Sequence, residues 1–267
     1  MDYIRLFFVA LSFAIITSCA CTSKKTMPNS TARSSNLAAY LKSEAANMFV
    51  QDSLRYLLPT LDSIILDDQR YRADYYNYIN EQEQLDSVNM IRLKPIFKRY
   101  GWLGIYQIGI RVTHIVYVLV HADMRDKDFF MPFLLDGYRK GTLTPLAFYT
   151  FIDSYLQGRS EAQLFGTQMT IDSNVKAISI KDVYPVYDPA NIQKRWTVYG
   201  NPYTRSYAAV MQTSYKMTWN VAEYEKYVLQ NCQKLKISLD STTHINRMLH
   251  LLDSCKALMG KNNTNLR

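Results

Sequence analysis

The sequence predicts a mainly α fold, an irregular multi-helix domain with a small two-stranded β element around residues 165–187. Apolar residues make up 48% of the 267 residues and charged residues 20%, a balance that supports a packed core. Through most of the chain the apolar residues recur every three or four positions, as in helices that bury one face. Alternation at every second position is confined to residues 163–187, so strands are expected only there.

Residues 1–18 are typical of a lipoprotein signal peptide that ends before Cys19. An apolar run covers residues 6–16, and small side chains stand directly before the cysteine, as a signal peptidase requires. A membrane-spanning helix needs about 20 apolar residues, so this run is too short for a retained anchor. The alternatives are an ordinary secretory signal in which Cys19 happens to lie near the cleavage site, and an uncleaved amphipathic N-terminus.

The pattern resembles bacterial lipoprotein signals, which implies diacylglycerol on the Cys19 sulfur and acylation of the new amino group. Residues 19–35 are small and polar, so they are expected to form a flexible tether. No acidic cluster follows Cys19. We therefore expect a protein of the cell envelope, attached to the membrane through lipid at Cys19, on the outer membrane and facing the periplasm.

A single helical domain is expected over residues 36–262. Its first helical patterns cover 37–41 and 54–65, and Pro59 should kink or divide the second. A further helix is expected from Asp86, a suitable N-cap, to Gly101.

Residues 105–122 form the most apolar helical pattern after the signal peptide. Their polar side chains, Arg111 and two histidines among them, argue against a membrane span and for a central buried helix. Helices are expected next over 126–141 and 144–158, and Thr144 can cap the second of these.

The last part of the chain predicts a short helix from Asp188 to Trp196 and a helical hairpin over about 220–260. Cys232 and Cys255 lie in the two arms of this hairpin. An exported location permits a disulfide between them, and two buried thiols are the alternative.

The net charge of +8 is spread along the chain and accompanies no nucleic-acid-binding motif, so no nucleic-acid partner is expected. Anionic lipid headgroups or cell-wall polymers suit such a surface better after export. There is no GxSxG elbow, GxGxxG loop, phosphate loop or Cys/His cluster with metal spacing. The sequence therefore predicts neither a cofactor nor a metal site.

Short polar motifs recur between the helical patterns. They are DQxxR at residues 68–72, DxxN at 86–89, GW at 101–102, HAD at 121–123 and FGTQ at 165–168. In order and spacing they resemble an uncharacterised helical domain family of bacteria, whose members are often exported or lipid-anchored. The resemblance covers about residues 50–207, and Phe165 stands where the family commonly has Tyr. It implies domain boundaries and a candidate site, and no activity.

His121 and Asp123 are the candidate catalytic residues. A histidine beside a carboxylate can act as a general base, and Asp123 would orient the ring. The alternative is that His121 caps the carbonyl groups at the end of its own helix. A zinc site that includes His114 is not expected, because no further ligand has suitable spacing.

The candidate ligand-binding residues are Gln69, Arg72, Thr167 and Gln168. Gln69 and Arg72 are three positions apart and so share one helical face. Thr167 and Gln168 follow a glycine turn and offer a hydroxyl and an amide, although such groups also merely close loops.

Two functions follow from these observations. The first is a non-catalytic binding or scaffolding module for an envelope protein or polymer. The alternative is a periplasmic hydrolase that uses His121 and Asp123 with Arg72, Gln69 and Gln168.

Overall fold

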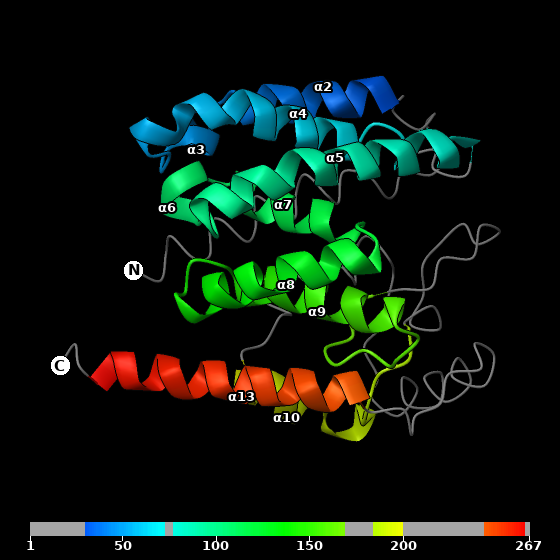
Figure 1. Cartoon of the computed structure of the whole chain (residues 1–267), viewed down its shortest axis with the longest axis vertical. Coiled ribbons are helices and arrows are strands. Elements are labelled where there is room, and N and C mark those ends of the chain that lie inside the picture. The colour runs from blue at the N-terminus through cyan, green and yellow to red at the C-terminus, as the bar shows by residue number, and fades with distance from the viewer. Residues whose placement is uncertain (1–29, 73–76, 169–183, 200–242, 265–267) are drawn as a thin grey trace. The chain divides into compact units, whose positions relative to one another are not determined.

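The computed structural model describes residues 30–72, 77–168, 184–199 and 243–264 (Figure 1). Within these ranges it is mainly α and contains no strand. The predicted signal peptide, Cys19, most of the tether and Cys232 lie outside them. No helix within them is long and apolar enough to cross a membrane.

The chain divides into two compact units, and the boundary between them in the sequence falls between Leu143 and Thr144, inside the region predicted as one domain. The helices of the first unit are α2 (Ser30–Leu41), α3 (Glu44–Asn47), η1 (Asp52–Leu57), α4 (Leu58–Asp68), α5 (Ile79–Tyr100), α6 (Ile105–Ile108), α7 (Arg111–Val120) and α8 (Met124–Arg139). Those of the second are α9 (Pro145–Gly158), η4 (Pro189–Asn191), α10 (Ile192–Tyr199) and α13 (Thr243–Thr264).

In the first unit α4 packs against α2, α5 and α7 (Figure 1). Its inward face consists of Leu61, Ile64 and Ile65, all almost fully buried. Pro59 lies in the first turn of α4, where its missing N–H is not needed, and it divides the pattern of residues 54–65 into η1 and α4. α2 begins at Ser30, within the predicted tether.

The predicted start of α5 at Asp86 was wrong. The helix begins at Ile79, so Asp86 lies inside it and its carboxylate is available for contacts with other elements. The predicted end was correct, since Gly101 adopts a φ of 69° and its N–H donates to the Phe97 carbonyl at 2.9 Å.

The helix predicted over residues 105–122 is two helices, α6 and α7. They are separated at Gly109, which has a φ of 63° and approaches the α3 backbone closely. A Cβ at this position would lie 2.4 Å from the Ala46 carbonyl oxygen, so only glycine fits. α7 is largely buried, as expected, and packs against α4, α5, α6 and α8.

Gly137 lies within α8 beneath the indole ring of Trp102. A Cβ at position 137 would lie 2.4 Å from two atoms of that ring. Trp102 is itself buried and meets Phe97 edge-on, with 5.9 Å between the ring centroids. The glycine therefore lets an aromatic ring pack directly on a helix backbone.

In the second unit Thr144 caps α9 as predicted, and its hydroxyl accepts from the N–H of Ala147. Residues 169–183 lie outside the described ranges, so for them the β element stays a prediction. The described residues beside them contain an isolated parallel bridge between Gln163 and Val186.

Candidate functional site

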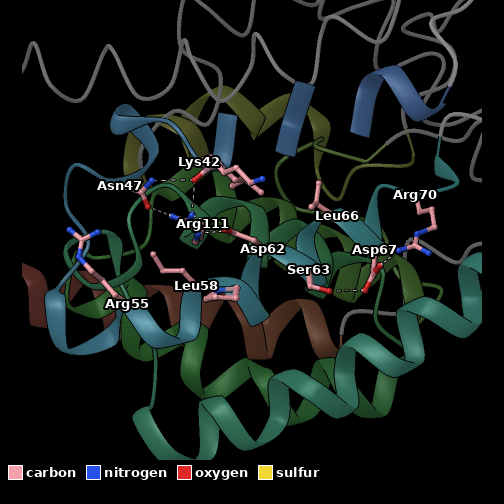
Figure 2. Close-up of a pocket in the computed structure, with 12 residues that line it drawn as sticks. Lys42, Asn47, Arg55, Leu58, Asp62, Ser63, Leu66, Asp67, Arg70 and Arg111 are labelled. Carbon is pink, nitrogen blue, oxygen red and sulfur yellow. Dashed lines mark hydrogen bonds and ion pairs between the residues drawn. The ribbon is translucent and has the colours of Figure 1, made fainter. Parts of the chain in front are cut away.

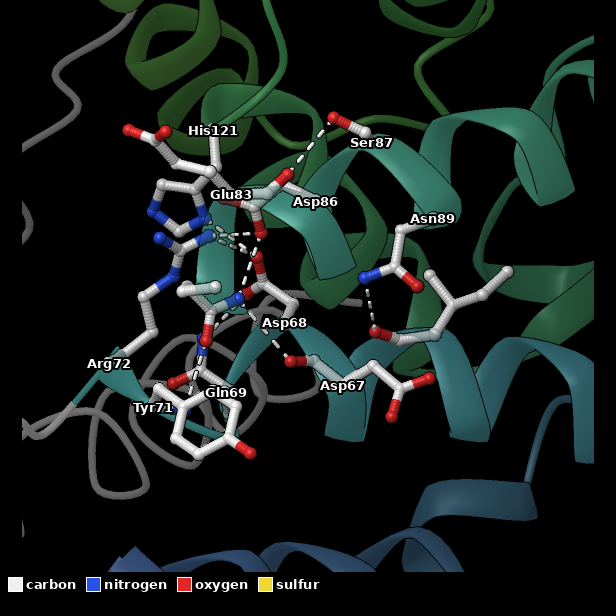
Figure 3. A network of polar contacts seen from close by, with 12 residues as sticks. Asp67, Asp68, Gln69, Tyr71, Arg72, Glu83, Asp86, Ser87, Asn89 and His121 are labelled. Carbon is white, nitrogen blue, oxygen red and sulfur yellow. Dashed lines mark hydrogen bonds and ion pairs between the residues drawn. The ribbon is translucent and has the colours of Figure 1, made fainter. Parts of the chain in front are cut away.

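Asp68, the last residue of α4, is the centre of a polar network in the first unit (Figure 3). Its carboxylate accepts hydrogen bonds from Gln69 Nε2 at 2.6 Å, from Arg72 Nη2 at 3.0 Å and from His121 Nδ1 at 2.7 Å. The side chain of Asp68 is only 2% exposed. The two candidate ligand-binding residues of this unit, Gln69 and Arg72, therefore share one buried carboxylate with His121.

Asp68 is ionised at neutral pH. Burial alone would raise its pKa, but His121 and Arg72, through their charge and hydrogen bonds, outweigh burial and lower the pKa to about 2. A carboxylate can only accept hydrogen bonds, so Nδ1 of His121 must carry the proton in their shared bond. The basic nitrogen of the neutral ring is then Nε2.

His121 directly follows α7, where its backbone N–H donates to the Val118 carbonyl. Its side chain does not cap that helix, because Nδ1 bonds to Asp68. The side chain is 32% exposed, and in the described part of the chain Nε2 makes no hydrogen bond. An oriented ring whose basic nitrogen remains available is the arrangement that general-base catalysis needs.

Arg72 joins Asp68 to α5. Its Nη2 also donates to Asp86 Oδ1 at 2.6 Å, and the same oxygen accepts from Gln82 Nε2 at 2.9 Å. Gln82 in turn accepts from the backbone N–H of Tyr71 at 2.9 Å. Burial alone would lower the pKa of Arg72, but the contacts with Asp68 and Asp86 together outweigh burial and raise the pKa, so the guanidinium stays charged.

Asn89 and His114 are among the other polar side chains buried in this unit. Asn89 donates to the Ile64 carbonyl at 3.3 Å, while its Oδ1 and His114 Nε2 lack hydrogen-bond partners within the described residues. Burial lowers the pKa of His114 to about 4, so this ring is neutral at pH 7. His121 is therefore the better candidate for a base in contact with solvent.

Asp123 does not contact His121 in this network. It is the N-cap of α8, where its side chain accepts from the N–H of Asp126 at 2.7 Å and is 60% exposed. The carboxylate that orients His121 is that of Asp68. Asp68 is part of the DQxxR motif, but the sequence analysis gave it no role. Its partner His121 lies 53 positions away, so no local pattern connects the two residues.

Thr167 and Gln168 belong to the second unit, and Thr167 contacts the buried carboxylate of Asp153. Asp153 accepts from the backbone N–H groups of Leu164 at 2.8 Å, Phe165 at 3.0 Å and Thr167 at 2.9 Å. The Thr167 hydroxyl adds a bond of 2.8 Å. This carboxylate therefore organises the turn that contains both candidate residues.

Burial raises the pKa of Asp153 to about 6, because the hydrogen bonds from the turn only partly offset the loss of solvent. None of these donors carries a charge. Gln168 closes the turn from the other side, since its Nε2 donates to the Thr150 carbonyl at 3.0 Å. Both side chains therefore make bonds that close the turn, and their role in ligand binding stays a prediction.

Helix α10 donates two hydrogen bonds to the backbone of the same turn. Arg195 donates from Nε to the Leu164 carbonyl at 3.0 Å, and Trp196 donates from Nε1 to the Phe165 carbonyl at 3.3 Å. The phenyl ring of Phe165 stacks on Tyr149 with 3.9 Å between the ring centroids. The turn is therefore fixed by contacts within its own unit.

Glu161 extends this arrangement to the C-terminal helix. Its carboxylate accepts from the backbone N–H groups of His244 at 3.2 Å and Ile245 at 3.0 Å, at the start of α13. Cys255 is buried on that helix, whereas its predicted partner Cys232 lies outside the described residues.

No group of three or more His, Cys, Asp or Glu side chains within the described ranges could hold a metal ion. A scan against models of protein families gave no match, and searches of curated proteins and of solved structures gave none either. The candidate function must therefore be argued from the chemistry of the site.

Proposed function

We propose that the first unit carries a general-base site for hydrolysis, with His121 as the base and Asp68 as its orienting carboxylate. The observation that carries this proposal is the bond of 2.7 Å between His121 Nδ1 and Asp68, which leaves Nε2 available on a partly exposed ring. Asp68 takes the place that the sequence analysis assigned to Asp123.

In this proposal Nε2 accepts a proton from a water molecule as the water oxygen attacks the substrate. The imidazolium that forms is stabilised by the ionised Asp68, and it returns the proton to the leaving group. Arg72 acts as a positioning residue, because its bonds to Asp68 and Asp86 hold the orienting carboxylate in place. Base catalysis of this kind contributes about 10²–10⁴-fold to a rate.

The test is hydrolysis of 4-nitrophenyl acetate and 4-nitrophenyl phosphate by the full chain over a range of pH. His121→Ala should lower the rate on the accepted probe by about 10²-fold or more. Asp68→Asn should lower it less and change its pH profile, which a purely structural role would leave alone. His250→Ala, which alters an exposed histidine on α13, is the matched control and should keep the wild-type rate.

Either of two results would overturn the proposal: no turnover by the wild-type chain above the blank, or equal rates for wild type and His121→Ala. The Asp68 network would then serve only to join α4, α5 and α7. In that case the non-catalytic binding module expected from the sequence would be the better function.

We further propose that this unit acts at the cell envelope, anchored by lipid at Cys19 and facing the periplasm. The support is the apolar run of residues 6–16 with small residues before Cys19. Several acyl chains together would make the attachment lasting. Metabolic labelling with a radioactive fatty acid should mark the wild-type chain and not Cys19→Ala, and equal labelling of both would contradict the anchor.

A further inference from the structure

The network around His121 carries more negative than positive charge. Asp68 and Asp86 share one cation, Arg72, whose Nη2 bonds to the two carboxylates at 3.0 Å and 2.6 Å. The amide groups that also donate to these carboxylates are uncharged. With a neutral His121, two negative charges and one positive charge leave the network with a net negative charge.

Glu83 adds a further negative charge at the same place. It lies three positions before Asp86, so the two side chains share one face of α5, and Figure 3 places both beside His121. Glu83 is exposed, and its carboxylate forms no hydrogen bond or ion pair in the part of the chain that the structure describes. A ligand that reaches Nε2 of His121 therefore meets a carboxylate that no cation compensates.

The cations nearest to this site in the sequence pair with other carboxylates. Arg70 and Arg92 both pair with Asp67. Asp67 and Arg70 line a groove of about 640 Å³ along α4, to which no residue of the network contributes (Figure 2). On α8, Arg125 lies 3.9 Å from Asp123. These cations are therefore not shared with the network.

The helix ends at this site do not reverse its charge. α4 ends at Asp68 and α7 ends at Val120, directly before His121, and a helix C-terminus has about half a negative charge. α5 and α8 begin nearby, but each has an acidic side chain at its start, Glu81 and Asp123 respectively, which offsets the positive end. An anionic ligand is therefore repelled from His121, and a cationic ligand is attracted.

We propose that the substrate of this site is a carboxylic ester that carries a positive charge a few bonds from the scissile bond, and that Glu83 selects it. This inference rests on the proposed role of His121 as a general base. An alkylammonium group of the substrate would pair with the Glu83 carboxylate, while the ester carbonyl meets the water that Nε2 activates. Phosphate monoesters carry a charge of about −1.5 to −2 at pH 7, so the same field would exclude them.

Three 4-nitrophenyl esters with acyl chains of similar length test this proposal on the full chain. They are the neutral pentanoate, the anionic hydrogen glutarate and the cationic 4-(trimethylammonio)butanoate. At low salt the kcat/KM of the cationic ester should exceed that of the anionic ester by about tenfold, and the ratio should fall at high salt. Glu83→Gln should lower this ratio by about threefold or more. Because Glu83 is exposed, this variant should fold.

Glu44→Gln is the matched control, because it removes the same charge from an exposed position on α3. It should keep the wild-type ratio. The inference fails, and the general base stands, if the anionic ester is hydrolysed as fast as the cationic one. It fails also if Glu44→Gln lowers the ratio as much as Glu83→Gln does.

Absence of turnover with all three esters would instead contradict the proposed function. The selection of charge is then tested by binding of two unreactive amides, 4-(trimethylammonio)butanamide and glutaramate. The cationic amide should shift the NMR signal of His121 Cε1–H more than the anionic amide does, and Glu83→Gln should reduce that shift. An equal or larger shift with glutaramate overturns the selection of a cation.

Discussion

Asp68 and Asp153 are both buried carboxylates, one in each unit, yet their acidities shift in opposite directions. The pKa of Asp68 is lowered to about 2 and that of Asp153 is raised to about 6. Burial favours the neutral acid in both cases. Asp68 differs in having a guanidinium and an imidazole as partners, whereas among the described residues the donors to Asp153 are backbone N–H groups and a hydroxyl.

The number of hydrogen bonds that a buried acid accepts therefore does not decide whether it is ionised. Asp153 accepts from at least four donors and is still partly protonated near pH 6. Asp68 has fewer partners, and their charge keeps it ionised. A charged Asp68 suits a site that stabilises an imidazolium, whereas Asp153 suits a structural centre for a turn.

The largest effect is expected for Asp153→Ala. This change leaves the buried N–H groups of Leu164 and Phe165 and the partly buried N–H of Thr167 without their acceptor, and each buried group of this kind costs about 1–3 kcal/mol. The free energy of unfolding in urea should fall by about 3–5 kcal/mol. Asp136→Ala, which removes an exposed pair with Lys140, should cost less than about 0.5 kcal/mol. A loss below about 1 kcal/mol for Asp153→Ala would contradict the assigned role.

The next effect is a dependence on pH that differs in sign between the two acids. In the folded protein the pKa of Asp153 is raised above 3.8. Its titration therefore adds to the free energy of unfolding below about pH 4, and this contribution is lost as the pH rises to about 6. The folded pKa of Asp68 is lowered, so its contribution is complete above about pH 4 and is lost as the pH falls toward 2. Each change should amount to about 2–3 kcal/mol.

Urea unfolding of Asp153→Asn and Asp68→Asn, each compared with wild type across this range, measures the two contributions. On acidification from pH 7 to 4, the free energy of unfolding of wild type should rise relative to that of Asp153→Asn. On acidification from pH 5 to 2, the free energy of unfolding of wild type should instead fall relative to that of Asp68→Asn. Parallel trends for the two variants would remove the contrast between the two acids.

The smallest effect is expected for Thr167→Val, which removes the hydroxyl bond to Asp153 and keeps the backbone bond. The cost should be about 1 kcal/mol in the free energy of unfolding. The hydroxyl bond lowers the pKa of Asp153, so its removal should move the pH transition upward. If the pH at which the stability changes is the same in Thr167→Val and wild type, the hydroxyl does not act on the Asp153 carboxylate.

Much of the fold could be predicted because its boundaries depend on local chemistry. Thr144 and Gly101 mark a helix start and a helix end through their own side-chain and backbone properties. The break at Gly109 could not be predicted in this way, because the close approach of Ala46 requires it and an isolated glycine is tolerated in a helical pattern. Asp86 resembles an N-cap in sequence, and only tertiary contacts show that the helix begins earlier.

The candidate site was predictable in its residue types and less so in its pairings. Gln69, Arg72 and His121 were identified from the sequence, and they do meet at one carboxylate. That carboxylate belongs to Asp68, because the packing of α4 on α7 brings residues 53 positions apart into contact. Asp123 is nearer in sequence, but a cap at the start of α8 already uses its oxygen.

The packing of Trp102 on Gly137 has a consequence for the evolution of this chain. A side chain at position 137 would collide with the indole, and a smaller residue at 102 alone would leave a cavity. Glycine within a helix costs about 0.5–1 kcal/mol relative to alanine, so it has no advantage without the ring above it. In homologous chains the two positions should therefore change together, with a larger residue at 137 accompanying a smaller one at 102.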